Sequence, residues 1–400
     1  MTTHASAGAR APIEPGQTLG VMGGGQLGRM FVHAAQRMGY STAVLDPDAD
    51  SPAGRVSHHH VVCGYQDAPG LDRLAGLSAA ITTEFENVPA AALSALAARR
   101  PVAPGAGAVA IAQDRALEKA HFGRCGVACA PYALITGRQA LQDVAPALLP
   151  GILKTTRLGY DGKGQQRVGT TAELARAWDA MGQVPCVLEQ LLPLEAECSV
   201  VLARGADGQM VQLPVQRNLH RAGILAVTEV HPHNLPPGVA ERAVAAARDI
   251  AAGIDYVGVL CVEFFLLQGG ALVVNEMAPR PHNSGHWSLD GCDVSQFELQ
   301  VRTLAGLPLV APRAHGPAIM LNLLGELWFR RGAAATPPPW SELLALPGSH
   351  LHLYGKSDAR PGRKMGHLNV TGESLEAVRA TALQACALLG IEPFEPGGAA

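Results

Sequence analysis

The strongest constraint on the fold is a strand, glycine turn and helix near the N-terminus. Apolar residues 19–22 are followed by the turn Gly23-Gly24-Gly25-Gln26-Leu27-Gly28 and by an amphipathic run to Met38. The same alternation continues with strands predicted at 41–45 and 79–83 and a helix at 90–99. Because strands that alternate with helices over about 100 residues build a parallel sheet covered on both faces, this region predicts a doubly wound α/β domain.

The turn itself is open to more than one interpretation. Gly23-x-Gly25-x-x-Gly28 between a strand and a helix has the form of a dinucleotide fingerprint. Asp46 lies 18 residues after Gly28 (46 − 28 = 18), near the position of a ribose-binding acid. The pattern also occurs in sheets that bind other phosphates and in tight turns with close packing, and Arg29 adds a cation suited to a phosphomonoester. An NAD-dependent oxidoreductase is therefore one hypothesis among several at this point.

Length and composition limit the class of protein. At 400 residues the chain exceeds the roughly 250–300 residues at which single cores stop growing, which predicts two or three domains. Aromatic residues make up 4% and the net charge is −3, so nucleic-acid binding is disfavoured. No apolar run reaches the ~20 residues that cross a bilayer, so no membrane partner is expected. Eight dispersed cysteines without a CxxC pair are typical of a reducing cytosol and predict a cytoplasmic protein.

A second glycine-rich loop lies between two β segments in the middle of the chain. It runs from Gly159 to Gln165 and follows Lys154, and it does not open a helix as a Walker loop would. A flexible hairpin of this kind can close over triphosphate oxygens with its N–H groups, while the lysine supplies a point charge. The strand Cys186–Leu192 ends in Glu189 and Gln190, where backbone groups could read an adenine and the carboxylate could hold a ribose. An acid at a strand end is, however, usually solvated.

Two glutamates lie in neighbouring apolar strands. Glu263 and Glu276 are 13 residues apart (276 − 263 = 13) across a Gly269-Gly270 turn, which predicts antiparallel strands with both carboxylates on one face. A carboxylate in an apolar strand is unfavourable unless it is paired or bound to a metal. With Asn275 beside them, the two acids predict a Mg²⁺ site completed by ATP oxygens, and salt bridges to arginines are the alternative.

Two cation-rich loops follow in the last third of the chain. Residues 280–287 contain one Arg, two His and one Asn, and Arg280 can hold a planar oxyanion through two parallel hydrogen bonds. Lys356 and the run Arg360–His367 form a second cationic loop. This second loop is an ordinary solvated loop unless it folds back over the first glycine turn.

Four of these segments together carry a resemblance to a known family. In chain order they are Gly23–Met30, Gly159–Gln165, Asn275–Trp287 and Arg360–His367. With the Glu189-Gln190 strand end they resemble the ATP-grasp superfamily and, within it, the 5-(carboxyamino)imidazole ribonucleotide synthase family of de novo purine synthesis. The resemblance spans residues 17–389.

The resemblance implies a ligase that joins carbon to nitrogen. ATP, bicarbonate and 5-aminoimidazole ribonucleotide would give the N-carboxylated ribonucleotide, ADP and phosphate through carboxyphosphate. The first glycine turn would then help to hold the ribose phosphate, so neither NAD nor biotin is expected as a cofactor and Asp46 loses its suggested role. The alternatives are another ATP-grasp enzyme, such as a biotin carboxylase or a glycinamide ribonucleotide ligase, and a catalytically inactive nucleotide-binding regulator.

The resemblance also implies roles for residues, carried over by position. The residues that would contact ATP are Arg115, Lys154, Gly159, Tyr160, Asp161, Gly162, Lys163, Gly164, Gln165, Glu189, Gln190, Leu191, Leu192, Glu197, His220, Asn275 and Glu276. One or two Mg²⁺ ions would bind Glu263 and Glu276. The residues that would contact the ribonucleotide are Gln26, Leu27, Glu84 or Glu86, Tyr160, Asp161, Lys163, Ser284, Lys356 and Arg363. The catalytic groups would be Arg280, His282, Lys356 and Asp161. The family often has Arg at the position of Lys163, which retains the charge and loses the bidentate geometry.

The sequence therefore predicts an α/β protein, α+β overall, with an ATP-grasp fold in three parts. A disordered leader is expected at 1–16, a doubly wound pre-ATP-grasp domain at 17–112, an ATP-grasp domain at 113–315 and a small C-terminal substrate-binding lobe at 316–400. A mobile β-rich lid is expected at about 125–205. The resemblance implies a homodimer whose other partners are small molecules.

Overall fold

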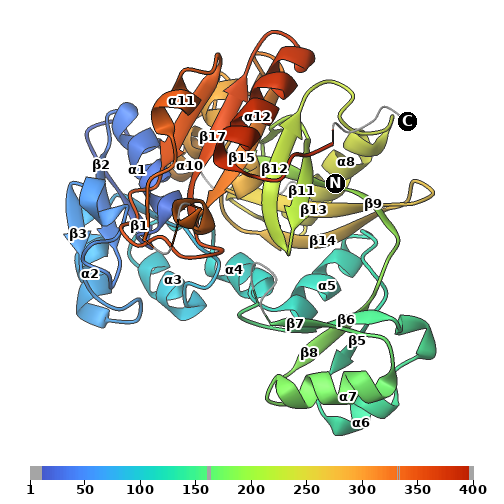
Figure 1. The fold of residues 1–400 in the computed structure, drawn as a ribbon. Coiled ribbons are helices and arrows are strands. Elements are labelled where there is room, and N and C mark those ends of the chain that lie inside the picture. Colours follow the sequence, from blue (N-terminus) through green and yellow to red (C-terminus); the bar gives the residue numbers. More distant parts are fainter. Residues whose placement is uncertain (1–10, 160–163, 331, 333, 396–400) are drawn as a thin grey trace, which may run out of the picture.

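The computed structural model describes residues 11–159, 164–330, 332 and 334–395 of the chain. Within these ranges the strands form three sheets, which follow one another along the chain (Figure 1). The first sheet has the order β3-β2-β1-β4 and all of its strands are parallel. Its strands are β1 (Thr18–Met22), β2 (Ser41–Leu45), β3 (His59–Val61) and β4 (Ala80–Thr83).

Helices cover both faces of the first sheet, which confirms the predicted doubly wound domain. On one face, the core joins β1 to α1 (Gln26–Arg37) and to a helix from much later in the chain, α10 (Gln296–Ala305). The other face is covered by α2 (Ala68–Leu77), α3 (Ala90–Ala97) and α4 (Ala106–Ala112). The packing of α10 on α1 attaches this domain to the centre of the molecule.

The prediction of a disordered leader at 1–16 is wrong for its last residues. Residues 1–10 lie outside the described ranges. Ile13 is only 3% exposed because it packs into the core shared by α1 and α10, and its N–H donates to the carbonyl of Ala305 at 2.8 Å. The carbonyl of Ile13 in turn accepts the hydroxyl of Tyr40 at 2.6 Å. Burial of one apolar side chain and two hydrogen bonds are enough to order this segment.

The second sheet is small and stands apart from the main body at the bottom of Figure 1. It has the order β5-β8-β6-β7 and is antiparallel. Its elements are β5 (Tyr132–Ile135), α6 (Arg138–Gln142), β6 (Gly151–Thr155), β7 (Gln165–Val168), α7 (Thr171–Ala180) and β8 (Cys186–Gln190). These are the elements of the predicted lid, but the lid ends near residue 190, because the next strand already belongs to the main sheet.

The third sheet is the largest and runs through the centre of the molecule into the C-terminal lobe. It has nine strands, with the order β14-β13-β9-β11-β12-β15-β17-β16 and with β10 paired to β9. The strands from the central region are β9 (Leu194–Arg204), β10 (Met210–Gln212), β11 (Gln216–Arg221), β12 (Ile224–Val230), β13 (Gly258–Leu267) and β14 (Leu272–Ala278). Those from the C-terminal region are β15 (Ala318–Leu324), β16 (Ser349–Leu353) and β17 (Lys364–Thr371).

Helices pack on this sheet along its whole length. In the centre, α8 (Val239–Ala252) covers β9 and β13, and α5 (Arg115–Arg124) lies beside β14. In the C-terminal lobe, α12 (Leu375–Leu389) packs on β15 and β17, and α11 (Trp340–Leu344) adjoins β16. The predicted boundary near residue 315 therefore falls within a continuous sheet, because β15 pairs directly with β12. Two short helical segments between β14 and α10 complete the fold: a 3-10 turn (Asn283–Gly285) and α9 (Ser288–Gly291).

Among the described residues, no helix has both the length and the apolar character needed to cross a membrane.

Candidate active site

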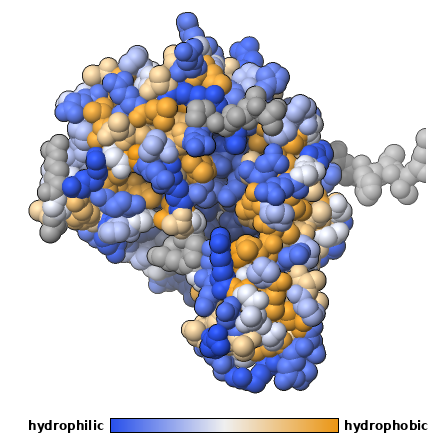
Figure 2. All heavy atoms as spheres, turned by 45° about the vertical axis from the view of Figure 1, so that its right-hand side comes forward, coloured by the Kyte–Doolittle hydropathy of each residue, from blue (hydrophilic) through white to orange (hydrophobic). Residues whose placement is uncertain are grey.

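A polar cavity of about 710 Å³ lies where the three parts of the chain meet. Figure 2 shows a hollow with hydrophilic residues between the main body and the smaller lobe. The cavity is lined by residues from the first glycine turn, the strand end after β4, helix α5, the loop after β14 and the C-terminal cationic loop. The predicted site residues among them are Gln26, Leu27, Glu84, Glu86, Arg115, Gly159, Glu276, Arg280, His282, Lys356 and Arg363.

The first glycine turn forms the N-terminus of α1, and three of its N–H groups already donate to carboxylates of the protein. The N–H of Gly24 donates to Asp46 at 2.6 Å, and those of Gly25 and Gly28 donate to the two carboxylate oxygens of Glu84 at 2.7 and 2.9 Å. A Cβ atom at Gly25 would lie 2.4 Å from a Glu84 oxygen, so the turn requires glycine here. These amides are not open to a pyrophosphate, and the dinucleotide interpretation of the motif is wrong for this physical reason.

Asp46 has a structural role that the sequence did not reveal. Besides the N–H of Gly24, its carboxylate accepts the hydroxyl of Tyr65 at 2.6 Å and the N–H of Asp48 at 2.9 Å. The ring of Tyr65 in turn lies 5.2 Å from that of Phe85, which lines the cavity. Asp46 therefore fixes the shape of the turn rather than binding a ribose.

Glu84 and Glu86 both line the cavity but have different partners. Glu84 is 8% exposed and fills the glycine turn, and burial raises its pKa despite these hydrogen bonds. Glu86 forms a close ion pair with the Nε group of Arg280. Burial alone would raise the pKa of Glu86, but the guanidinium outweighs it and the pKa is lowered. The two candidates for the substrate contact thus have different roles in the protein. Glu84 accepts hydrogen bonds from the glycine turn, and Glu86 orients Arg280.

The loop after β14 brings Arg280, His282 and Ser284 together. Arg280, which lines the cavity, uses Nε for Glu86 and one Nη1 hydrogen for the carbonyl of Pro281 at 3.1 Å. Burial and the nearby Arg280 charge hold the pKa of His282 well below its usual value, so the imidazole is neutral. Its Nδ1 atom is 2.9 Å from the Ser284 hydroxyl.

Ser284 lies beneath the cavity instead of at its surface. Its side chain is fully buried, and its hydroxyl accepts from the Ser199 hydroxyl at 2.8 Å. In this arrangement the hydroxyl of Ser284 contacts His282, and Ser284 is not among the residues that line the cavity. Its contact with the ribonucleotide stays a prediction.

The C-terminal cationic loop does fold back to the first glycine turn, as its proposed role required. Lys356 and Arg363 line the same cavity as Gln26 and Leu27. The ammonium of Lys356 donates to the carbonyl of Lys364 at 2.7 Å and lies 5.6 Å from the centre of the Tyr354 ring. The cationic loop therefore brings Lys356, Arg363 and Lys364 to the same cavity as the first glycine turn.

The two glutamates of β13 and β14 are directly opposite each other, as the sequence predicted. Glu263 pairs with Glu276 in the antiparallel register, and a bulge at this point leaves Asn275 as the additional residue. Arg115 donates to Glu276 at 3.0 Å, and the Nε2 atom of His282 lies 3.6 Å from Glu263. The alternative of a salt bridge to arginine is thus present for Glu276 as well.

The environment separates the two carboxyl groups electrostatically. Burial raises the pKa of Glu263, and the neighbouring Glu276 adds to this shift, which the His220 charge opposes. For Glu276, burial is outweighed by the charges of Arg115 and Lys154, so its pKa is lowered.

This donor set fits a magnesium ion that takes its remaining ligands from a nucleotide. Among the described residues, Glu263 Oε1 and Asn275 Oδ1 are buried without a hydrogen-bond partner. Within the same residues, no three His, Cys, Asp or Glu side chains gather as a complete metal site. Mg²⁺ typically binds one or two carboxylates and completes its shell with water and phosphate oxygens, which agrees with a pair of carboxylates.

A buried charge cluster lies under the small sheet. Glu189 is 4% exposed, and its two oxygens bind Lys119 at 2.8 Å and Lys154 at 2.7 Å. Burial alone would raise the pKa of Glu189, but the two ammonium groups lower it to about 2. Both oxygens of Glu189 thus contact lysines, and its contact with a ribose stays a prediction.

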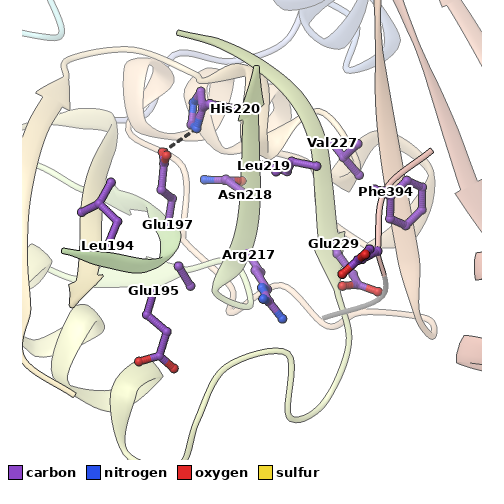
Figure 3. Close-up of a pocket in the computed structure, with 12 residues that line it drawn as sticks. Leu194, Glu195, Glu197, Arg217, Asn218, Leu219, His220, Val227, Glu229 and Phe394 are labelled. Atoms are coloured by element: carbon purple, nitrogen blue, oxygen red, sulfur yellow. Dashed lines mark ion pairs between the residues drawn. The ribbon is translucent and has the colours of Figure 1, made fainter. Parts of the chain in front are cut away.

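A smaller pocket of about 200 Å³ contains two more residues that were predicted to bind ATP. Glu197 on β9 and His220 on β11 form an ion pair at 2.5 Å, drawn as a dashed line in Figure 3, and both line this pocket. Burial lowers the pKa of His220, but the Glu197 contact outweighs it and the pKa is raised. Arg217, Glu229 and Phe394 line the other side of the same pocket.

The remaining predicted residues fall into two groups. Gly164, Gln165, Gln190, Leu191 and Leu192 lie in or beside the small sheet and do not line the large cavity. Tyr160, Asp161, Gly162 and Lys163 lie outside the described residues.

The sequence reasoning missed the full contribution of helix α5. Asp114 caps this helix by accepting from Ala116 N–H at 3.0 Å and Leu117 N–H at 3.4 Å. Beyond Arg115, however, Glu118 and Lys119 also point into the site, and each is 2% exposed. Charged residues three and four positions after Arg115 share its face of the helix, and this spacing was the available signal.

Comparison with known proteins agrees with this geometry. A family model described as an ATP-grasp domain matches residues 120–297. A ribonucleotide synthetase pre-ATP-grasp domain matches residues 16–113, and a phosphoribosylaminoimidazole carboxylase C-terminal domain matches residues 318–381. The fold and site thus define an ATP-grasp enzyme, as the motifs indicated.

Individual relatives narrow the class further. N5-carboxyaminoimidazole ribonucleotide synthases of Brucella melitensis biotype 1 and Bacillus subtilis are 42% and 38% identical to this chain, over 90% and 89% of it and 97% and 92% of their own lengths. A solved ADP complex of an N5-carboxyaminoimidazole ribonucleotide synthetase has a TM-score of 0.87 at 35% identity, over 95% of this chain and 98% of its own. The Aspergillus clavatus enzyme in complex with ADP and the aminoimidazole ribonucleotide has a TM-score of 0.85 at 30% identity, over 94% and 98%. The chain belongs to the N5-carboxyaminoimidazole ribonucleotide synthase family, a family of ATP-dependent ligases.

Proposed function

We propose that this chain carboxylates the exocyclic amine of 5-aminoimidazole ribonucleotide. ATP and bicarbonate are the co-substrates, and N5-carboxyaminoimidazole ribonucleotide, ADP and phosphate are the products. The observation that carries this proposal is the single cavity that combines the glycine turn of the first domain, the Glu276 strand of the centre and the Lys356–Arg363 loop of the C-terminal lobe. In this proposal, ATP and the ribonucleotide both bind in this cavity, and all three parts of the chain supply residues to it.

The first chemical step is the attack of a bicarbonate oxygen on the γ-phosphorus of ATP, which breaks the bond to ADP and forms carboxyphosphate. In this proposal, Lys154 and Arg115 stabilise the negative charge that spreads over the transferred phosphoryl oxygens. The support for these roles is that both cations pair with carboxylates of the candidate site, Lys154 with Glu189 and Arg115 with Glu276. The free end of Arg280, held at its other end by Glu86, is suited to orient the planar bicarbonate.

In the second step, the substrate amine attacks the carboxyl carbon, or CO₂ released from it, and phosphate leaves. The amine must lose a proton. The leaving phosphate is one acceptor in this proposal. The neutral imidazole of His282 is the other, and its lowered pKa makes it the weaker base. Because carboxyphosphate reacts readily with water, the small sheet is proposed to close over the site as a lid before the chemistry.

Glu263, Glu276 and Asn275 are the residues proposed to hold Mg²⁺. When bound, the ion would neutralise phosphate charge and favour in-line transfer. The three side chains present hard oxygen atoms, two of which are buried without a hydrogen-bond partner among the described residues.

The proposal also includes a cytoplasmic homodimer. All eight cysteines are free, as a reducing compartment requires. Light scattering on the purified full-length chain at several concentrations would test the dimer; a monomer mass throughout would contradict it.

The function is tested by measuring ADP release from the full-length protein with each substrate omitted in turn. Release must depend on both bicarbonate and aminoimidazole ribonucleotide, and ¹³C-bicarbonate must label the product carbamate. ADP formation that is indifferent to the ribonucleotide contradicts the proposal. A panel with biotin or with phosphoribosylamine and glycine distinguishes the two other ATP-grasp activities.

A further inference from the structure

Helix α5 presents three charged side chains to the site from one face. Arg115 contacts the carboxylate of Glu276, and Lys119 contacts that of Glu189. Glu118 lies between them and is equally buried, yet it contacts neither carboxylate. Its Oε1 atom accepts the main-chain N–H of Met277 at 2.7 Å.

The partner of Glu118 is a main-chain group at the edge of the large sheet. β14 is the terminal strand in the sheet order, so its outer side has no neighbouring strand. On this side, the N–H of Val274 donates to the carbonyl of Ala128 at 2.8 Å, and the N–H of Met277 is satisfied by Glu118. A buried N–H without an acceptor is strongly unfavourable, so the carboxyl oxygen is needed for β14 to keep this path.

The path of β14 matters at this point because the strand is bulged. Val274 pairs with Phe264 and Glu276 pairs with Glu263, so Asn275 is left unpaired between them. A bulge disrupts the ladder and changes the direction of the adjacent side chains, and bulges are frequent beside active sites. The direction in which the Glu276 side chain points therefore depends on contacts that fix the main chain after the bulge, such as the one at Met277.

The contact requires an acceptor atom and does not require a charge. Burial raises the pKa of Glu118 to about 8, while Arg115 opposes this shift. A glutamine side chain has the same length and the same carbonyl acceptor, and methionine has similar length and no strong acceptor. The two replacements therefore separate the hydrogen bond from side-chain volume.

We propose that Glu118 is a positioning residue for Glu276, acting through the main-chain N–H of Met277. By fixing the strand after the bulge, it directs the Glu276 carboxylate toward a nucleotide-bound Mg²⁺ ion. The identity of the ligand, nucleotide-bound Mg²⁺, rests on the proposed function. The hydrogen bond between Glu118 and the Met277 N–H is observed in this chain.

The test uses the full-length protein, with ADP and Mg²⁺ as probes. Calorimetry gives the dissociation constant of ADP with and without Mg²⁺ for the wild type, Glu118→Gln and Glu118→Met. We expect Glu118→Met to weaken Mg²⁺-dependent ADP binding by about 10–100-fold, the range for groups that orient metal ligands. ADP binding without Mg²⁺ should stay within about threefold, and Glu118→Gln should resemble the wild type in both conditions.

Asp114→Ala is the matched control, because it removes the N-cap of the same helix and leaves the Met277 contact in place. It should lower the midpoint of thermal unfolding without changing the effect of Mg²⁺ on ADP binding. If Glu118→Met does not fold, Glu118→Asp supplies the same comparison, since it keeps the carboxyl group and is one methylene too short to reach the Met277 N–H.

The inference is overturned if Glu118→Met, or Glu118→Asp in its place, binds ADP and Mg²⁺ as tightly as the wild type. It is also overturned if Glu118→Gln is impaired as strongly as either of them. Glu276→Gln distinguishes this failure from failure of the proposed function. If Glu276→Gln is impaired while Glu118→Met is normal, only the inference falls. If Glu276→Gln is normal, the metal assignment falls, and the positioning role falls with it.

Discussion

Two regions of this molecule have the sequence of a phosphate-binding site, and they differ in what already occupies them. In the first glycine turn, fixed main-chain N–H groups bind the carboxylates of Asp46 and Glu84. In the centre, the ammonium groups of Lys154 and Lys119 bind Glu189. A main-chain N–H has one hydrogen to donate, whereas an ammonium group has three. The N–H groups of Gly24, Gly25 and Gly28 therefore have no hydrogen left for a further anion, whereas the lysines can keep their carboxylate and still bind a phosphate.

The largest expected effect lies on the metal-binding side of the centre. Glu276→Gln should reduce kcat by about 1000-fold or more, which corresponds to about 4 kcal/mol of lost transition-state stabilisation. Coupled detection of ADP measures the loss, and circular dichroism checks that the variant is folded. Glu298→Gln is a control that removes the carboxylate of a part-buried ion pair with Arg302 on α10. Full activity of Glu276→Gln would remove the metal assignment.

The second prediction concerns the stability of the buried lysine pair. Glu189→Gln leaves two ammonium groups without their carboxylate and should destabilise the fold by about 3–5 kcal/mol. Urea unfolding of both proteins at neutral pH measures the difference. If the free energy of unfolding changed by less than about 1 kcal/mol, the cluster would behave like an exposed ion pair and would be solvated in solution.

The same pair gives a pH dependence of known sign. The two lysines lower the folded-state pKa of Glu189 from 4.5 to about 2. A depressed carboxyl pKa contributes stability that is fully present above the unfolded value and is lost as the pH falls through the folded value. The stability difference between wild type and Glu189→Gln should therefore shrink between about pH 4.5 and about pH 2. Equilibrium unfolding at several pH values in this window measures it, and a constant difference would contradict the assignment.

A smaller effect is expected in the first glycine turn. Asp46→Asn weakens charge-assisted hydrogen bonds to Gly24 and Tyr65 and should cost about 1–3 kcal/mol of stability. Because the turn carries Gln26 and Leu27, the KM for the ribonucleotide should rise more than the KM for ATP. Steady-state kinetics with each substrate varied gives the two values. If both KM values rose equally, Asp46 would stabilise the fold in general and would have no specific effect on ribonucleotide binding.

The smallest effect is expected far from both regions. Arg313 pairs with Asp293 on the surface, where the arginine side chain is 86% exposed. Arg313→Ala should change the free energy of unfolding by less than about 0.5 kcal/mol, because exposed ion pairs contribute little. Thermal unfolding and kcat should both match the wild type. A large change would mean that surface charge, and not the buried clusters, governs stability.

Much of the fold was accessible from local sequence patterns. The β13–β14 hairpin, the pairing of Glu263 with Glu276, the cap at Asp114 and the long helix α12 all depend on interactions close in sequence. The strand β3 was not predicted, because His59–Val61 is short and carries two histidines. The order seen at Ile13 was also missed, since its partners lie on α10, nearly 300 residues later.

The site was predictable in part for the same reason. The sequence indicated that Arg280 and Glu86 are site candidates, but only their contact across the chain shows that one orients the other. Ser284 was expected at the cavity surface and lies beneath it, because the loop after β14 turns its hydroxyl toward Ser199 on β9.

The sequence alone determined the alternation of strands and helices, the hairpin that pairs two carboxylates, and the family, because these follow from short-range periodicity and from motifs in a fixed order. The tertiary structure decided which anion fills each phosphate-binding motif. Whether a glycine turn or a lysine is available to a ligand depends on carboxylates such as Glu84 and Glu189, which reach it from distant segments. A buried N–H or ammonium group must have a partner, and only the packed chain shows whether that partner is already part of the protein.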